Sequence, residues 1–418
     1  MAAPAMVTIA LEHDLTGSNA ELAASHNRRV ILEAIHRHAP ISRTELARRS
    51  GLTKQAVARI AERLMAEGLI VEARRRRGQR GQPAIELEID PVGCFGIGVS
   101  VDRDYVTALA VDAAGRVCGR RHHETPYVLP ETFVELVADA VREFQADGAI
   151  DPDRVMGIGL AVPDWLGEMP FPGMPASYAA WTGFDLRGRI GALTGLRVYI
   201  DNDATAAAVG ELNYGLGRVS RSFFQVNIGA GLGGGLVLDG HCHRGTTGLG
   251  GEIGWLPVVD TSAPEGSRVK PLGELVSLFV LYRCLGRHGL AVSEPHQLLA
   301  LDERGRALVS QWLRGAAAYL AEAAVDIGLL VNPDAVVLGG RLPVPLIEEL
   351  LATTRNLLAA SRRPAVALHR AARSEDASAF GAATIPIAHR LMLESADPQQ
   401  LLRLPLAGMP ARYGSALP

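Results

Sequence analysis

Two carboxylates and an amide follow one another in Asp201-Asn202-Asp203. The apolar run 196–200 before them predicts a buried strand, and residues 205–214 after them predict a helix. Such α/β units place binding sites at the carboxyl ends of their strands. A carboxylate beside an amide suits bidentate hydrogen bonding to vicinal hydroxyl groups. Alternatively, Asp203 caps the helix that starts at Thr205, and the two roles are compatible.

A second set of polar residues could read base pairs. Thr53, Lys54, Gln55 and Arg59 occupy the first turns of a predicted helix 54–67, on the side away from its apolar residues. In the major groove, Gln pairs with adenine, and Lys or Arg pairs with guanine. We also assign Arg43, at the start of the preceding helix, to this DNA-facing set.

Three helices must position these side chains. A helix over 27–39 ends at Pro40, and Ser42-Arg-Thr-Glu45 predicts a capping box for the second helix. Gly51 ends that helix, and Thr53 caps the third. Two short helices joined by a glycine turn predict a helix-turn-helix. Its predicted buried positions are Leu46, Ala47, Leu52, Val57, Ile60 and Leu64.

A basic hairpin follows these helices. Predicted strands over 69–73 and 84–89 flank a wing tip that contains four consecutive arginines, and this tip adds Arg76, Arg77, Arg80 and Gln82 to the DNA-facing set. Residues 26–83 hold 14 Lys/Arg against 5 Asp/Glu, whereas the whole chain has a net charge of −3. This is the electrostatic footprint of a DNA-binding module. The alternative is a solvated charged surface, although consecutive arginines repel one another unless an anion meets them.

The remaining composition limits the class of protein. With 418 residues and 48% hydrophobic content, the chain can hold the small module and a two-lobed domain. It has no run of 18 apolar residues, and its four cysteines are scattered. We therefore expect a cytoplasmic protein with reduced thiols, no membrane span and no metal site. The expected parts are a tail 1–22, a winged module 23–90, a small lobe 91–205, a large lobe 206–395 and a tail 396–418.

Further patterns predict an α/β fold. Residues 94–111 predict a hairpin, 131–145 an amphipathic helix, and 155–162 a buried strand. A strand over 222–228 runs into a glycine-rich turn over 229–235, and another strand covers 335–338.

Four motifs in order carry a resemblance to a known family. They are Asn202-Asp203-Ala-Thr-Ala-Ala-Ala, Gly229-x-Gly-x-Gly, Gly250-Gly-Glu252-Ile-Gly and Pro333-Asp-x-Val-Val-Leu-Gly-Gly340. Together they resemble the ROK family of repressors and sugar kinases, and the preceding winged module is similar to that of the ROK repressors. The resemblance covers roughly residues 25–390. It implies an actin-like ATPase (ribonuclease H-like) fold, with two α/β lobes around a cleft.

The resemblance also implies a sugar site. In ROK kinases, the residue equivalent to Asp203 removes the proton from the sugar hydroxyl, and residues equivalent to Glu252 and Glu274 bind the same sugar. Trp255 stands where the family usually has a histidine that contacts sugar and ligates zinc. It could stack on a sugar face or fill the volume of the missing zinc loop. The implied sugar-binding residues are therefore Asn202, Asp203, Glu252, Trp255 and Glu274, with no structural zinc.

One departure bears on catalysis. ROK kinases cradle ATP phosphates with an Asp-x-Gly-Gly-Thr turn, and the equivalent stretch here is Gly98-Val-Ser-Val-Asp102. Phosphate approach to the backbone needs glycine, and phosphoryl transfer depends on positioning and charge neutralisation. We therefore expect no catalytic residue and no ATP cofactor. The turn at 229–235 is then either a tight strand turn or part of a hinge.

A second departure lies in the wing. ROK repressors commonly carry Gly-Arg-Pro there, whereas this chain has Gly81-Gln82-Pro83. Arg77 or Arg80 could enter the minor groove instead.

These features predict a sugar-responsive transcriptional regulator, a repressor rather than an activator. Its expected partners are double-stranded operator DNA and a sugar effector, and we expect a homodimer or homotetramer because such operators are two-fold symmetric. Two alternatives stay open. One is an active sugar kinase with an appended DNA-binding module, and the other is a DNA-binding protein whose second domain is only a dimerisation scaffold.

Overall fold

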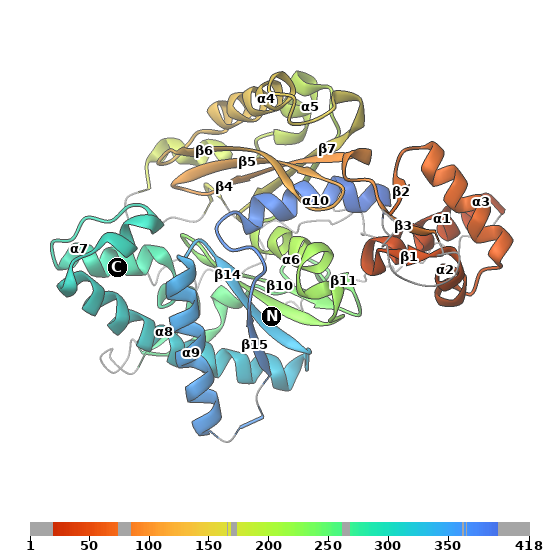
Figure 1. Ribbon diagram of the computed structural model, residues 1–418. Coiled ribbons are helices and arrows are strands. Elements are labelled where there is room, and N and C mark those ends of the chain that lie inside the picture. The colour runs from red at the N-terminus through yellow and green to blue at the C-terminus, as the bar shows by residue number, and fades with distance from the viewer. Residues whose placement is uncertain are drawn as a thin grey trace, which may run out of the picture.

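A computed structural model describes residues 20–73, 85–164, 166–168, 174–260, 268–361, 363–364 and 366–391. Figure 1 shows two sheets one above the other, two helices between them, and a small helical module at one end. Within the described part of the chain, no helix is both long enough and apolar enough to cross a membrane.

The end module is a winged helix-turn-helix. Its sheet has the strand order β1-β3-β2, and β1 was not predicted. The elements are α1 (Ala20–His38), β1 (Ile41–Ser42), α2 (Arg43–Ser50), α3 (Lys54–Ala66), β2 (Ile70–Glu72) and β3 (Glu86–Ile89). The predicted wing-tip residues Arg76, Arg77, Arg80 and Gln82 lie outside the described residues.

Short-range hydrogen bonds define the predicted helix ends. Ser42 Oγ accepts from Glu45 N at 3.2 Å, Thr53 Oγ1 accepts from Ala56 N at 3.2 Å, and Gly51 has a φ of 70°. Only half of the expected capping box forms, because the Glu45 carboxylate accepts from Arg48 and Arg49 instead.

The residues predicted to form the core of the module are buried to different extents. Three of its residues are fully buried, namely Leu46, Val57 and Leu64. The other three are half-buried and pack against the same core, namely Ala47, Leu52 and Ile60.

The small lobe is a five-stranded sheet with the order β6-β5-β4-β7-β8. Helices α4 (Pro130–Ala146) and α5 (Leu186–Thr194) cover its outer face (Figure 1). The predicted hairpin, helix and buried strand are found as β4–β5, α4 and β7. The strands are β4 (Phe95–Val101), β5 (Tyr105–Asp112), β6 (Val117–Glu124), β7 (Val155–Val162) and β8 (Val198–Asn202).

The large lobe has the strand order β11-β10-β9-β14-β15. Its strands are β9 (Phe223–Ile228), β10 (Leu232–Leu238), β11 (His241–Cys242), β14 (Ala335–Gly340) and β15 (Ala367–Arg370). A separate ribbon consists of β12 (Pro257–Val259) and β13 (Val269–Pro271), and the outer helices are α7 (Leu278–Arg287), α8 (Glu303–Leu330) and α9 (Val344–Ser361).

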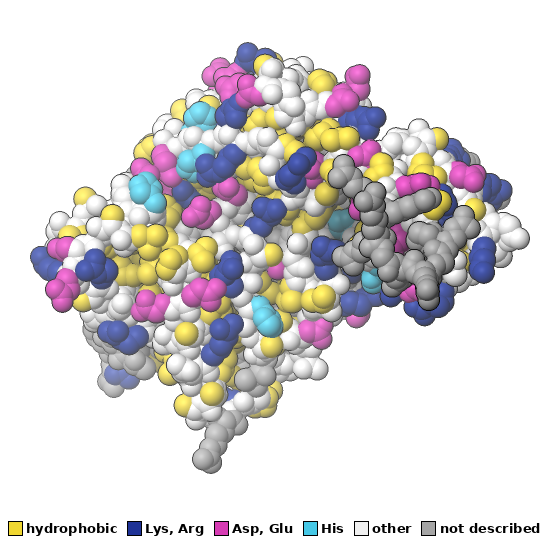
Figure 2. Space-filling view, viewed as in Figure 1, with side chains coloured by type: hydrophobic (Ala, Val, Ile, Leu, Met, Phe, Trp, Pro, Cys, Tyr) yellow, Lys and Arg dark blue, Asp and Glu magenta, His cyan; other side chains and the backbone are white. Residues whose placement is uncertain are grey.

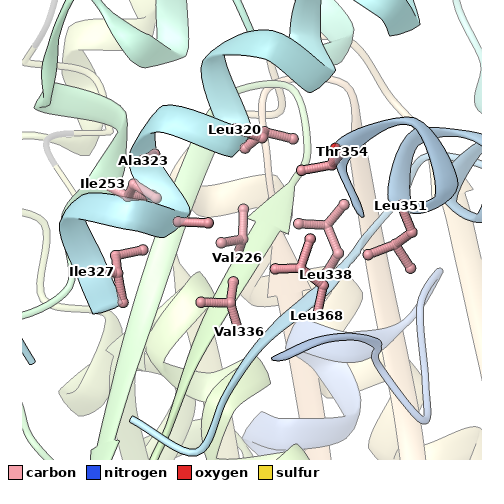
Figure 3. A pocket seen from close by; sticks show the side chains of 11 residues that line it. Val226, Ile253, Leu320, Ala323, Ile327, Val336, Leu338, Leu351, Thr354 and Leu368 are labelled. Atoms are coloured by element: carbon pink, nitrogen blue, oxygen red, sulfur yellow. The ribbon is translucent and has the colours of Figure 1, made fainter. Parts of the chain in front are cut away.

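A pocket lies inside the core of this lobe (Figure 3). Its lining is apolar apart from Thr354, whose hydroxyl donates to the Leu350 carbonyl oxygen at 2.7 Å. The pocket therefore offers no free polar group to a sugar.

Helices α6 (Asp203–Tyr214) and α10 (Ala377–Leu391) lie against each other between the two sheets (Figure 1). Helix α10 falls in the segment expected for the large lobe, yet it packs directly on β4 and β7 of the small lobe. A Cβ built on Gly98 of β4 would lie 2.0 Å from the Ala379 carbonyl oxygen, and one built on Gly381 of α10 would lie 1.7 Å from the Ala206 carbonyl oxygen. Glycine is required at both contacts, because any side chain would enter backbone atoms.

Candidate functional site

Strand β8 delivers the predicted polar residues to the junction of the two lobes, as expected. Helix α6 starts at Asp203, two residues earlier than predicted, and its cap is Asn202. Asn202 Oδ1 accepts from Ala204 N at 2.9 Å and from Thr205 N at 3.0 Å. The capping role considered for Asp203 therefore belongs to Asn202, and Asp203 occupies the first helical position.

The Asn202 side chain also joins two carboxylates. Its Nδ2 donates to Asp164 Oδ2 at 3.1 Å and to Glu252 Oε1 at 3.5 Å. Asp164 was not predicted, although a signal existed. It comes two residues after β7, which runs parallel to β8 with Val162 opposite Asn202, so the two strands end at the same edge.

Burial and mutual repulsion favour the protonated forms of these acids. Burial raises the pKa of Asp203 to about 7, and the negative charges of Asp102 and Asp164 add to the shift. Burial also raises the pKa of Glu252 to about 8, with Asp164 and Asp203 contributing. Near neutral pH the group therefore offers both O–H donors and carboxylate acceptors, which is the combination that hydroxyl groups require.

The other two predicted sugar residues lie on neighbouring short helices. Trp255 ends the 3₁₀ helix Ile253–Trp255 and is half-buried, while Glu274 ends the 3₁₀ helix Leu272–Glu274 and is exposed. The backbone connects the two segments, since Leu272 N donates to Leu256 O at 2.9 Å. Glu252 directly precedes the first of these helices, but no hydrogen bond of the described residues joins Glu274 to Asn202 or Glu252.

A buried ion pair supports the segment that carries Asn202. Arg244 Nη2 lies 2.6 Å from Asp201 Oδ2, and both side chains are at most 6% exposed. Asp201 Oδ1 also accepts from Asn202 N at 3.1 Å. Because Arg244 follows β11 of the large lobe and Asp201 belongs to β8, the pair joins the lobes beside the candidate site.

The first hairpin carries a different arrangement. Ser100 and Val101 are buried, and the Ser100 hydroxyl lies 3.1 Å from the Tyr105 hydroxyl. Asp102 is 8% exposed, and its Oδ2 lies 3.6 Å from a Cβ built on Gly229. A carboxylate therefore faces the glycine-rich turn.

A second arginine joins the lobes near this hairpin. Arg341, which follows β14, donates to Asp104 Oδ2 at 3.2 Å and to Glu124 Oε1 at 2.9 Å. Its guanidinium carbon lies 3.8 Å from the centre of the Tyr105 ring, a cation–π contact. Both acids and the tyrosine belong to the small lobe.

The glycine-rich segment has two parts. Residues 229–231 form the turn, in which Gly229 N donates to Gly231 O at 2.9 Å. Gly233 and Gly235 instead lie within β10, where added Cβ atoms would come within 2.7 Å and 2.6 Å of the Ala204 and Ala208 Cβ atoms. These glycines therefore allow α6 to pack directly on β10.

The predicted base-reading residues of α3 are on the surface. Thr53, Lys54, Gln55 and Arg59 are exposed, and Figure 2 shows Lys and Arg side chains at the outer edge of the winged module. Arg43 is placed differently. It is half-buried, and its Nη2 lies 4.0 Å from Glu72 Oε1.

The sequence predicts that the zinc loop of the family is missing from this chain. The segment concerned includes residues 261–267, which lie outside the described residues. Its described flanks are tied by Lys270 Nζ, which donates to Asp260 Oδ2 at 2.9 Å. In the described part of the chain, no three His, Cys, Asp or Glu side chains are grouped so that they could hold a metal ion.

The raised pKa of Glu252 predicts a pH-dependent stability. Its value of about 8 lies above the ordinary 4.5, so the folded chain retains a proton that the unfolded chain releases. The free energy of unfolding should therefore fall as pH rises from about 4.5 to about 8. Glu252→Gln cannot titrate, so its stability curve should be flatter across this window. Urea unfolding at several pH values measures the difference, with Glu274→Gln at the exposed carboxylate as control. Parallel curves for Glu252→Gln and the native chain would contradict the assigned burial.

Comparisons with known proteins agree with the two-module fold. A model described as "ROK family" matches residues 96–389, and one described as "Winged helix-turn-helix DNA-binding" matches residues 25–71. The xylose repressor of Bacillus spizizenii is 28% identical over 242 residues, which cover 58% of this chain and 62% of that repressor.

Solved structures match over more of the chain. A ROK family transcriptional regulator, a homolog of the E. coli MLC protein, has a TM-score of 0.62 and 21% identity, covering 88% of this chain and 96% of that one. A ROK family glucokinase from Streptomyces griseus, solved with glucose and AMPPNP, has a TM-score of 0.54 and 24% identity, covering 70% and 98%. The predicted fold class, a winged helix-turn-helix followed by a two-lobed actin-like fold, is confirmed.

Proposed function

This chain belongs to the ROK family, and we propose that it is a sugar-responsive transcriptional repressor. Its winged module binds operator DNA, and a sugar bound where the lobes meet releases that DNA. The observation that carries the proposal is that one chain holds both the exposed polar side chains of α3 and a group in which buried Asn202 binds half-buried Asp164 and Glu252.

The DNA-binding half rests on α3. Thr53, Lys54, Gln55 and Arg59 present donors and acceptors to base edges, while phosphate contacts come from the basic surface around them. Arg43, at the start of α2, belongs to the same DNA-facing set, and its Nη2 lies 4.0 Å from Glu72 Oε1 of β2. Residues 74–84, including Arg76, Arg77, Arg80 and Gln82, complete the contact to DNA. Because such operators are two-fold symmetric, the active species is a homodimer or homotetramer, which acts in the cytoplasm.

The sugar-binding half rests on the acids at the lobe junction. Asn202, Asp203 and Glu252 bind sugar hydroxyls, and Asp164 completes the group. Trp255 and Glu274, on the adjacent short helices, close the site from the large lobe.

Phosphoryl transfer is not the role of this site. A kinase must neutralise the charge of the transferred phosphoryl group, yet the carboxylate of Asp102 faces the glycine turn. The resemblance implies two glycines where buried Ser100 and Val101 stand, and Arg341 is already bound by Asp104 and Glu124. The rival function, an active sugar kinase with an appended DNA-binding module, is favoured only by the presence of Asp203.

The test is fluorescence anisotropy on DNA from upstream of the chain's own gene, with a panel that includes D-xylose, D-glucose and sugar phosphates. We expect tight binding that one sugar weakens about tenfold or more. Asp203→Ala should bind this DNA normally and no longer respond, because it removes a sugar contact far from α3. Asp185→Ala, which removes an acid that caps α5, is the matched control and should respond normally. ATP-dependent sugar turnover at about 1–100 s⁻¹ would instead establish the kinase.

A further inference from the structure

Helix α6 reaches from the candidate sugar site to the winged module. Its cap, Asn202, and its first residue, Asp203, lie in the site. Its 12 residues give a length of roughly 18 Å, at about 1.5 Å per residue. Its last turn lies under α1 of the DNA-binding module, where Asn213 and Tyr214 contact His36.

The contact with α1 is specific and buried. His36 Nε2 donates to the Asn213 carbonyl oxygen at 2.9 Å, and the His36 ring meets the Tyr214 ring edge-on with centroids 4.9 Å apart. The neighbouring Arg37 donates from Nη1 to the Gly217 carbonyl oxygen at 3.2 Å. Burial lowers the pKa of His36 to about 4, so the ring is neutral and its Nε2–H serves a carbonyl that the end of α6 leaves unpaired.

Between its ends, α6 is buried and closely packed. Residues 204–211 are all buried, and the helix rests on Gly233 and Gly235 of β10 and on Gly381 of α10. These contacts are between backbones and small side chains. They hold α6 closely, and Glu211 Oε2 also accepts from Ala372 N at 2.9 Å, so the helix has little room to bend between its ends.

The far end of α6 is also tied to the small lobe. The Tyr214 hydroxyl donates to the Ala113 carbonyl oxygen at 3.1 Å, and the Tyr214 ring packs edge-on against Phe380 of α10 with centroids 5.7 Å apart. The last turn of α6 therefore contacts both α1 and the small lobe.

We propose that α6 transmits effector binding to the DNA-binding module as a single rigid element. A ligand that binds Asn202 and Asp203 shifts the start of the helix, and His36 and Arg37 follow its end. His36, Arg37 and Tyr214 are thus positioning residues that touch neither sugar nor DNA. The inference rests on the proposed function for its biological meaning, but the mechanical link can be tested without any ligand.

The first test is hydrogen exchange of the full-length chain carrying Asn202→Ala. Loss of an N-cap costs about 1 kcal/mol, so opening of α6 should become about fivefold more frequent. If α6 is the link, amides of α1 over residues 31–38 should exchange about fivefold faster as well. The control is Asp185→Ala, which removes the cap of α5, where Asp185 Oδ1 accepts from Gly188 N at 2.9 Å. It should leave α1 unchanged. Faster exchange confined to the first turn of α6 would overturn the proposal.

The second test runs in the opposite direction, because coupling between two sites is reciprocal. His36→Phe keeps a ring against Tyr214 and removes the donor to Asn213. The amides of Ala204 and Thr205, at the sugar-site end of α6, should then exchange faster, and His296→Phe at an exposed histidine should not change them. Unchanged Ala204 and Thr205 amides would refute the link. If both tests succeed and no sugar releases DNA, the link stands and the proposed effector role falls.

Discussion

Gly98→Asp is expected to lower the free energy of unfolding by more than about 4 kcal/mol, enough to unfold many domains. A Cβ at this position would lie 2.0 Å from the Ala379 carbonyl oxygen and 2.2 Å from the Ala383 amide nitrogen, both in the backbone of α10. The added carboxylate would also be buried without a partner. Urea unfolding followed by circular dichroism measures the loss.

This substitution also bears on function, because the resemblance to ROK kinases implies an aspartate at the position of Gly98. We expect no sugar phosphorylation from it, since α10 occupies the space that the side chain would need. The control is Gly286→Asp, which makes the same change on α7, where a Cβ meets no atom within 4 Å. A Gly98→Asp chain that is as stable as the native one would refute the packing, and one that phosphorylates sugars would contradict the repressor assignment.

Arg244→Ala is expected to cost about 3–5 kcal/mol, because it leaves the Asp201 carboxylate buried and unpaired. The pair is 2.6 Å long at its shortest, and Asp201 is 5% exposed. Since Asp201 also accepts from the Asn202 amide, the loss should disturb the sugar site and abolish the sugar response. Thermal unfolding and operator anisotropy measure the two effects.

The double variant Asp201→Asn, Arg244→Met is the control for charge. It removes both partners and keeps their volume, so it should recover most of the lost stability, because two neutral side chains leave no buried charge. Should Arg244→Ala and the double variant be equally unstable, the loss would come from packing rather than from the unpaired carboxylate.

In the winged module, the helix starts were predicted correctly where a single side chain caps the helix. Ser42 and Thr53 accept from amides three residues ahead, so each pair of partners can be recognised in a short stretch of sequence. The predicted capping box forms only in part, because the Glu45 carboxylate can bind other donors that the motif does not include. Arg48 and Arg49 lie one turn further along the same helix and carry charge, and a charged pair is stronger than a bond to a neutral amide.

The candidate site was predicted in part. Asn202, Asp203 and Glu252 were named, but Asp164 was missed because it follows a predicted strand without belonging to any motif. A capping role was considered as an alternative for Asp203 because the helix was expected to begin at Thr205. Strand β8 in fact passes into α6 without an intervening loop, and this leaves Asn202 as the cap.

By itself, the sequence determined the order of the two modules, the capped starts of α2 and α3, the concentration of positive charge in the winged module and the strand that carries Asn202, whereas α1 begins at Ala20 rather than at the predicted residue 27. These properties depend on neighbours within one helical turn or on composition. Only the tertiary structure decided that Asp164 and Glu252, 38 and 50 residues from Asn202, share its amide. It also decided that Gly98 lies against α10 and that His36 contacts the end of α6, 177 residues away. Such contacts depend on how the whole chain packs, because each pair is brought together by the sheets and helices between them.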